Sequence, residues 1–293
     1  MRSSRSWRWP TLLLTLCAAL VLHQPGAAFA AEPALSFSGC GGVTVNPVNA
    51  DFEQQVVELV NARRAEHGLP PLKRVEPLEY AARYHAADMA LDGYFEHDSY
   101  DRHGDTLVKA CDTWTRIASY YDGFANAENI AAGYADPITV MEGWMNSPGH
   151  RNNILNATSR EIGVGYYEGG SWGRYWVQNF GLRNNVYPLV INSDARWTES
   201  TAVTLYIYGQ WAEMRLRNDD GPWGAWQPFQ STVAWTLRPQ AGTRTVHIEL
   251  RMAGAGGQTA SSHDTIWLAL APPTPGDLMP QAYLPLIIRH TPN

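Results

Sequence analysis

Apolar residues recur at helical spacing in three stretches of the first half of the chain, 51–67, 78–91 and 137–145. In each stretch they lie three and four positions apart, which predicts amphipathic helices. Gly68 and Gly93 follow the first two stretches and predict where those helices end. The pair Ser147–Pro148 predicts the N-cap and the first position of a fourth, short helix, because serine caps helices and proline favours the first turn.

Strand patterns follow the helices. Residues 161–167 and 173–180 alternate apolar and polar positions and predict a hairpin. Beyond residue 186 the chain consists of short β-prone runs between Asn, Asp and Gly turns. We expect strands there at 202–208, 213–217, 232–237, 245–252 and 265–269. Short strands at this spacing predict a β-sandwich, so the fold class is α+β with an all-β second half.

The change of pattern near Val186 divides the chain into parts. We expect a signal peptide at 1–30, an N-terminal arm at 31–50, a first domain at 51–184, a β-sandwich at 187–271 and a Pro-rich tail at 272–293. The tail holds one apolar run, which we expect to be a last strand or a docked segment rather than a membrane anchor.

The first thirty residues are typical of a secretory signal. Three arginines precede an apolar run at 11–22, and the small residues Ala28 and Ala30 predict cleavage after Ala30. The apolar run is too short to cross a bilayer. The sequence therefore predicts a secreted, extracellular or cell-envelope protein without a membrane span.

The net charge limits the classes of binding partner, and the cysteine content bears on the redox state of the compartment. The formal net charge is −6, and it becomes −9 without residues 1–30, which hold three arginines and no carboxylate. An acidic chain argues against nucleic acid or an anionic membrane as partner. Outside the signal, two cysteines remain, Cys40 and Cys111. Export to an oxidising compartment predicts that they form a disulfide, and two free thiols are the alternative.

Two histidines and a carboxylate stand in short polar motifs: His97 in FEHDS, Glu128 in AENIA and His150 in SPGHRNN. Two neutral imidazoles suit Zn²⁺ or another divalent metal, and Glu128 can orient a histidine or a bound water. The same groups suit acid–base chemistry, because histidine titrates near neutral pH. The chain contains no HExxH or GxSxG motif and no glycine-rich phosphate loop.

Seven segments, taken in order, resemble the CAP superfamily (cysteine-rich secretory proteins, antigen 5 and pathogenesis-related 1), also called SCP-like extracellular domains, in their bacterial form. They are 59–64, 68–72, 81–89, 95–99, 127–131, 144–155, and 162–165 with 175–181. The resemblance implies an α-β-α sandwich with a central cleft lined by two histidines and two glutamates. By position His97 and His150 are the histidines and Glu128 is the first glutamate. Ser147 stands where the second is expected, so the resemblance implies a triad.

The second half resembles the immunoglobulin- and fibronectin-like modules of bacterial surface proteins, in residues 214–219, 226–229 and 235–237. This implies a spacer or adhesion module. Five tryptophans offer an alternative, an exposed platform for a polysaccharide. They are Trp211, Trp223, Trp226, Trp235 and Trp267.

Three functions remain open. The first is a secreted binding protein whose cleft holds a divalent metal or a small ligand such as a lipid or a peptide, with the sandwich attached to a surface or a partner. The second is a metal-assisted, peptidase-like hydrolase that uses His97, Glu128 and His150. The third is a structural or adhesive envelope protein with an idle cleft.

Overall fold

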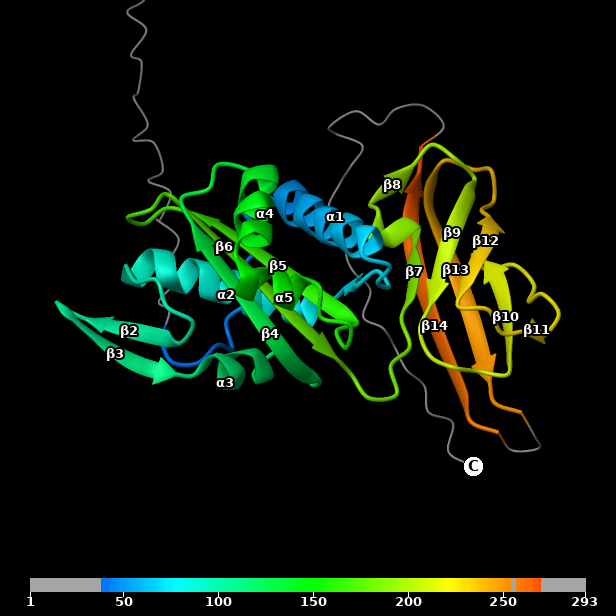
Figure 1. Cartoon of the computed structure of the whole chain (residues 1–293), viewed down its shortest axis with the longest axis horizontal. Helices are drawn as coiled ribbons and strands as arrows, with labels where there is room; N and C mark the ends of the chain where they lie inside the picture. The colour runs from blue at the N-terminus through cyan, green and yellow to red at the C-terminus, as the bar shows by residue number, and fades with distance from the viewer. Residues whose placement is uncertain (1–37, 254–256, 270–293) are drawn as a thin grey trace, which may run out of the picture. The chain divides into compact units, whose positions relative to one another are not determined.

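The computed structural model describes residues 38–253 and 257–269 (Figure 1). The predicted signal peptide and Pro-rich tail lie outside these residues. No helix of the described ranges is long and apolar enough to cross a membrane. The α+β fold class with an all-β second half is confirmed. The division into domains at residues 184–187 stays a prediction.

A four-stranded sheet forms the middle layer of the first half. Its order is β1 (Lys73–Arg74), β5 (Glu161–Glu168), β6 (Arg174–Leu182) and β4 (Phe124–Ala132). The pairs β4–β6 and β5–β6 are antiparallel, whereas β1 lies parallel to β5. The predicted hairpin is confirmed. Strand β4, which the sequence pattern did not predict, forms one edge of the sheet.

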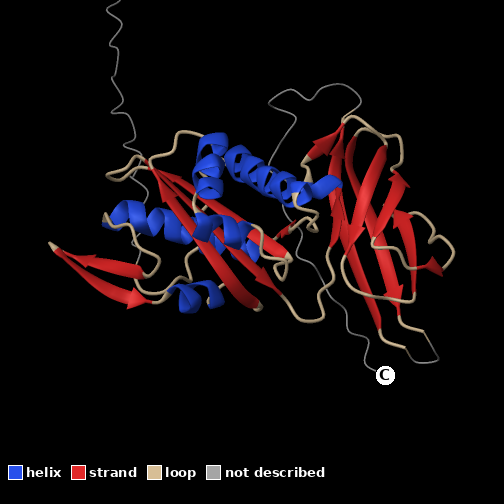
Figure 2. Cartoon of the chain, in the orientation of Figure 1, coloured by secondary structure: helices blue, strands red, loops and turns tan. Residues whose placement is uncertain are grey.

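Helices cover both faces of this sheet (Figure 2). One face packs against α1 (Ala50–Glu66), α4 (Pro137–Asn146) and α5 (Pro148–Ile154), and the other against α2 (Glu76–Asp92) and α3 (Thr113–Ala118). A Cβ atom at Gly163 or Gly165 would come within 2.1–2.3 Å of the α2 backbone. The two glycines therefore allow α2 to lie directly on β5, and the α-β-α arrangement follows.

Side chains cap two helix starts for which the sequence analysis named no cap. Asn49 accepts a hydrogen bond from the Phe52 amide at 3.0 Å, and Asp136 forms a capping box at the start of α4. Ser147 occupies the N-cap position of α5, as expected, but its side chain makes no capping hydrogen bond. Proline at the next position supplies the pre-set backbone angle that starts this helix.

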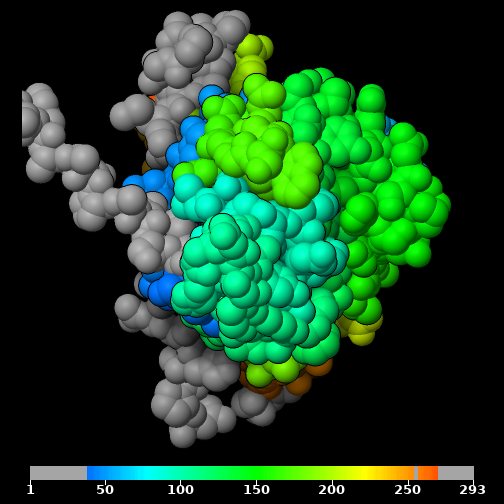
Figure 3. Space-filling model, turned by 90° about the vertical axis from the view of Figure 1, so that its left-hand side faces the viewer, coloured from blue at the N-terminus to red at the C-terminus, as the bar shows by residue number. Residues whose placement is uncertain are grey.

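Residues 99–111 form a second hairpin, β2 (Ser99–His103) and β3 (Thr106–Cys111), on the face shown in Figure 3. The sequence patterns predicted no strands in this stretch, which is largely exposed. The disulfide between Cys40 and Cys111 is confirmed, with Cα atoms 5.7 Å apart. It attaches the N-terminal arm to the end of β3.

The second half is a sandwich of two sheets around one core. One sheet has the order β11 (Gln227–Pro228), β10 (Glu213–Asn218), β13 (Gly242–Arg251), β14 (Thr259–Leu268) and β8 (Trp197–Thr198). The other has β12 (Thr232–Thr236), β9 (Ala202–Ile207) and β7 (Leu189–Ile191). Alternate residues such as Leu205, Leu216 and Ile248 face the shared core, as the period of two predicts.

A short turn between β7 and β8, η1 (Asn192–Asp194), contacts α1 and β1 of the first half and forms the junction with the sandwich. Its three residues have positive φ angles of 46°, 58° and 66°, although none of them is glycine. The turn places Asp194 beside Lys73, whose ammonium lies 2.5 Å from carboxylate oxygens of both Asp194 and Asp264. These charged groups are almost fully buried, so the junction contains an internal ion-pair cluster.

Candidate functional site

The three predicted site residues reach the edge strand β4 from three directions. Glu128 lies on β4 itself, and His97 follows α2, whose end at Gly93 adopts the left-handed C-cap. His150 lies in α5, on the opposite face of the sheet from α2. An edge strand has helix layers on both sides but no neighbouring strand beyond it. Side chains from the two layers can therefore approach each other there.

A chain of hydrogen bonds fixes His97. Its Nδ1 lies 2.9 Å from Glu128 Oε1, and Arg116 on α3 donates to Glu128 Oε2 at 2.5 Å. Arg116 also donates to the His97 carbonyl oxygen at 2.9 Å, so the same guanidinium binds both His97 and Glu128. The Glu128 side chain is 2% exposed and Arg116 is fully buried, whereas the His97 side chain is 52% exposed. A buried ion pair thus holds an imidazole that is half exposed to solvent.

The two histidines have opposite pKa shifts. The hydrogen bond to Glu128 raises the pKa of His97 above its ordinary value. Burial lowers the pKa of His150, and the nearby charge of His97 lowers it further. Of the two histidines, His97 is therefore the more readily protonated.

Asparagines attach α5 to the edge strand and so position His150. Asn153 donates to the Glu128 carbonyl oxygen at 3.2 Å and to the Asn129 side chain at 2.9 Å. Asn129 in turn donates to the His150 carbonyl oxygen at 3.2 Å. These bonds satisfy polar groups of β4 that no further strand covers.

Sequence reasoning missed several residues that support the site. Arg116 lies in a short helix without any recognisable motif. Asn179, on the neighbouring strand β6, lies 3.0 Å from Glu128 Oε2 with its amide nitrogen turned to the carboxylate. His85 is fully buried, and its Nε2 lies 3.0 Å from the Glu96 carbonyl oxygen, next to His97 in the sequence. Burial lowers its pKa well below the ordinary value, so His85 is a neutral support of the loop.

The donor atoms at this site decide whether a resident metal fits. Within the described ranges, no group of three or more His, Cys, Asp or Glu side chains is arranged to hold a metal ion. Zinc sites use three protein ligands when catalytic and four when structural. His97 and His150 provide two imidazoles, and Ser147 stands where a further carboxylate was expected. The residues present therefore fall short of a zinc site, and metal binding stays a prediction.

The tryptophans of the sandwich were considered as a sugar-binding platform. All five are at least partly buried. Guanidinium groups lie 4.1–5.1 Å from the ring centroids of Trp223 and Trp226, in the order Arg217, Trp223, Arg215, Trp226, Arg251. Cation–π stacking of this kind covers the ring faces that a sugar would use.

Comparison with known proteins agrees with the resemblance. The model of the cysteine-rich secretory protein family (CAP) matches residues 57–180. The uncharacterized protein YkwD of Bacillus subtilis (strain 168) is 42% identical over 129 residues, 44% of this chain and 46% of that protein. The uncharacterized membrane protein YlbC of the same organism is 35% identical over 134 residues, 45% of this chain and 35% of that protein. The matches thus span less than half of either relative.

Among solved structures, an extracellular protein containing an SCP domain from Bacillus anthracis str. Ames is similar to this chain. The two are 33% identical, with a TM-score of 0.39, over 48% of this chain and 45% of the other. The family model covers the segment that contains His97, Glu128 and His150. The chain therefore carries, over residues 57–180, a domain of the cysteine-rich secretory protein (CAP) family.

Proposed function

We propose that the protein is an exported binding protein whose CAP domain holds a small ligand at His97 and His150. The observation that carries this proposal is the exposed His97 imidazole, held 2.9 Å from a buried glutamate that is itself paired with the buried Arg116. A solvent-facing donor that is already fixed in one orientation loses little entropy on binding. Because its pKa is raised, His97 favours ligands with an anionic acceptor group such as a carboxylate.

The proposed role of the sandwich is attachment to a surface or a partner. Its support is the second, separate core, which builds a module that the His97 site does not need. Export to the extracellular space or the cell envelope rests on the predicted signal peptide and on the family.

The pH dependence of binding tests the ligand class. Benzoate, a simple carboxylate, is expected to bind more tightly as the pH falls, because His97 is charged below its raised pKa. The gain approaches about tenfold per pH unit above the pKa of His97 and levels off below it. A divalent metal requires neutral imidazoles, so Zn²⁺ bound at this site would bind more weakly as the pH falls. Calorimetric titrations with benzoate and with zinc chloride, each between about pH 6 and pH 8, therefore distinguish the two.

Variants test whether benzoate or zinc binds at the two histidines. The His97→Ala/His150→Ala double variant should lose the binding, whereas His67→Gln, at an exposed position after α1, should keep it. Micromolar zinc binding that the double variant loses would replace the anion proposal by the metal one. If neither probe binds in a way that depends on these histidines, the site is idle and the structural function is the better account.

An acid–base hydrolase is the second candidate, favoured by the divergent pKa values of the two histidines. A protonated His97 would donate a proton and a neutral His150 would accept one. Turnover of a mixed peptide and ester library should then follow a bell-shaped pH profile. The acidic limb would come from His150, whose pKa is lowered, and the alkaline limb from His97, whose pKa is raised. Absence of turnover, or a profile that His150→Ala leaves unchanged, would contradict this candidate.

A further inference from the structure

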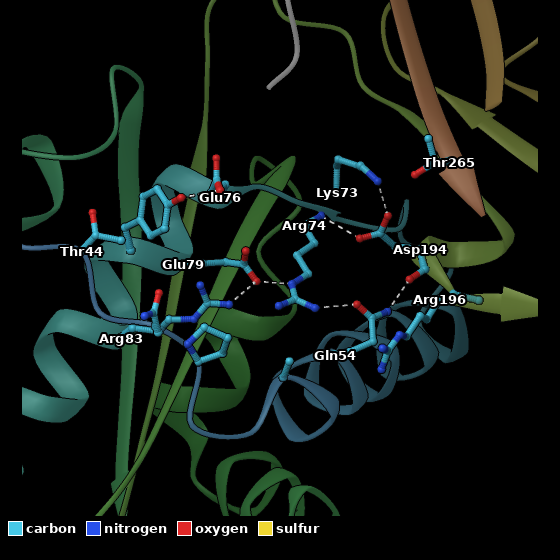
Figure 4. Close-up of a pocket in the computed structure, with 15 residues that line it drawn as sticks. Thr44, Gln54, Lys73, Arg74, Glu76, Glu79, Arg83, Asp194, Arg196 and Thr265 are labelled. Atoms are coloured by element: carbon cyan, nitrogen blue, oxygen red, sulfur yellow. Dashed lines mark hydrogen bonds and ion pairs between the residues drawn. The ribbon is translucent and has the colours of Figure 1, made fainter. Parts of the chain in front are cut away.

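A cavity of about 330 Å³ lies on the other side of the molecule's first half from β4, beside the junction turn (Figure 4). Its walls come from the N-terminal arm, β1, α2 and residues 194–196. None of the residues that line it takes part in the His97 site. A volume of this size is at the lower end of the range for small-molecule sites.

Glu79, on α2, is the lining residue with an unmet hydrogen-bonding atom. Its Oε1 forms ion pairs with Arg74 and, at 3.5 Å, with Arg83. Its Oε2 is buried and has no hydrogen-bond partner among the described residues. Figure 4 shows this second oxygen pointing away from both arginines. A carboxylate oxygen only accepts hydrogen bonds, so the group that matches it is a donor.

The charges around the cavity favour a cation as that donor. Four cationic side chains and three carboxylates line the cavity. Three further carboxylates, outside the lining, form ion pairs with these cations. The cations are Lys73, Arg74, Arg83 and Arg196, and the carboxylates are Glu76, Glu79, Asp194, Asp51, Glu53 and Asp264. Burial raises the pKa of Glu53. Even with Glu53 neutral, the carboxylates outnumber the cations.

Geometry selects the kind of cation. The Glu79 residue is 1% exposed, so only a slender group that enters the cavity can reach its Oε2. A primary ammonium is compact and donates three hydrogen bonds, whereas a quaternary ammonium has the same charge and no N–H. Pro47, Ala50 and Tyr80 supply apolar lining for a short carbon chain. A metal ion is disfavoured, because no cluster of three ligating side chains occurs in the described part of the chain.

We propose that this cavity is a binding site for a small primary amine, whose ammonium group donates to Glu79 Oε2 while its carbon chain lies against Pro47 and Ala50. The site is independent of the function proposed for His97, and its failure would leave that function untouched.

Ethanolamine is the probe, with tetramethylammonium and acetate as matched controls for charge without N–H and for opposite charge. Saturable binding is expected for ethanolamine alone, by calorimetry on the protein without its signal segment. In NMR spectra the Nε–H resonance of Arg74 should shift on titration, because this group donates to the other oxygen of Glu79. Equal binding of tetramethylammonium, or no saturable signal from ethanolamine, would overturn the proposal.

Variants separate the cavity from non-specific attraction to an acidic protein. Glu79→Gln keeps the shape, and it should weaken ethanolamine binding about tenfold or more, as the loss of a hydrogen bond to a charged group predicts. Glu249→Gln removes an equivalent Arg-paired carboxylate on the sandwich and should leave binding unchanged. Ala50→Met keeps every charge but fills the cavity. It tests whether the amine binds there even if Glu79→Gln does not fold. Unchanged affinity in Ala50→Met would place the amine elsewhere and contradict the proposal.

Discussion

Replacing Arg116 with methionine is expected to lower the free energy of unfolding by about 3–5 kcal/mol, the usual consequence of leaving a buried charge without its partner. Arg116 is fully buried and donates to Glu128 Oε2, and the Glu128 side chain is 2% exposed. Methionine fills a similar volume but cannot compensate the carboxylate. Urea denaturation at neutral pH measures the loss. A change below about 1 kcal/mol, typical of surface pairs, would show that the carboxylate is compensated by other groups.

The Arg116→Met variant should also change the chemistry of His97. The charge of Arg116 lowers the pKa of His97 and opposes the effect of Glu128. Its removal should therefore raise the pKa of His97 further, which an NMR titration of the His97 ring protons detects. Adding Glu128→Gln removes the stranded charge, so the double variant should recover part of the lost stability. Arg63→Met, which breaks an exposed pair with Glu66, is the control and should change stability little.

Replacing Lys73 with methionine is the second large effect, again about 3–5 kcal/mol of unfolding free energy at neutral pH. The Lys73 ammonium lies 2.5 Å from oxygens of Asp194 and Asp264, whose side chains are 6% and 4% exposed. Without it two carboxylates face each other in the interior of the junction. Lys109→Met, which breaks a surface pair with Asp98, is the matched control and should have little effect.

The loss of unfolding free energy in Lys73→Met should be larger at higher pH. Burial raises the pKa of Asp264 to about 6, and removing the neighbouring ammonium raises it further. In the unfolded chain the pKa of an aspartate is about 4. A carboxyl group whose pKa is higher in the folded state lowers the free energy of unfolding as the pH rises from the unfolded pKa to the folded one. The deficit of the variant should therefore be larger at about pH 7 than at about pH 5, in urea titrations at both values. A deficit that grows toward low pH would mean that Asp264 is ionised and compensated without Lys73.

Sequence patterns predicted the elements with strong periodicity and missed those without it. Helix α1 and the β5–β6 hairpin follow apolar repeats, and their bounds agree with the prediction within two residues. Strand β4 ends in the sequence AENIAA, and alanine, asparagine and glutamate are all poor strand formers. It is a strand because β6 pairs with it over its whole length, a tertiary effect that a local pattern does not contain.

The site residues were identified through family motifs, and their chemistry depends on contacts that the sequence does not display. His97 and Glu128 are 31 residues apart, and their contact depends on the layer arrangement. Arg116 has no spacing relation to either of them. The Cys40–Cys111 bond was predictable because the predicted mature chain has these two cysteines alone.

The backbone conformation of the turn Asn192–Asp194 affects the free energy of the junction. Left-handed backbone costs an L-residue about 1–2 kcal/mol, and three such residues follow one another here. The contacts of Asp194 with Lys73 and of the Ser193 carbonyl with Asn61 hold this conformation in place. Separating the sandwich from the first half would break these contacts and let the turn relax. The turn therefore holds backbone strain at the junction, and the buried ion pairs of Lys73 offset it.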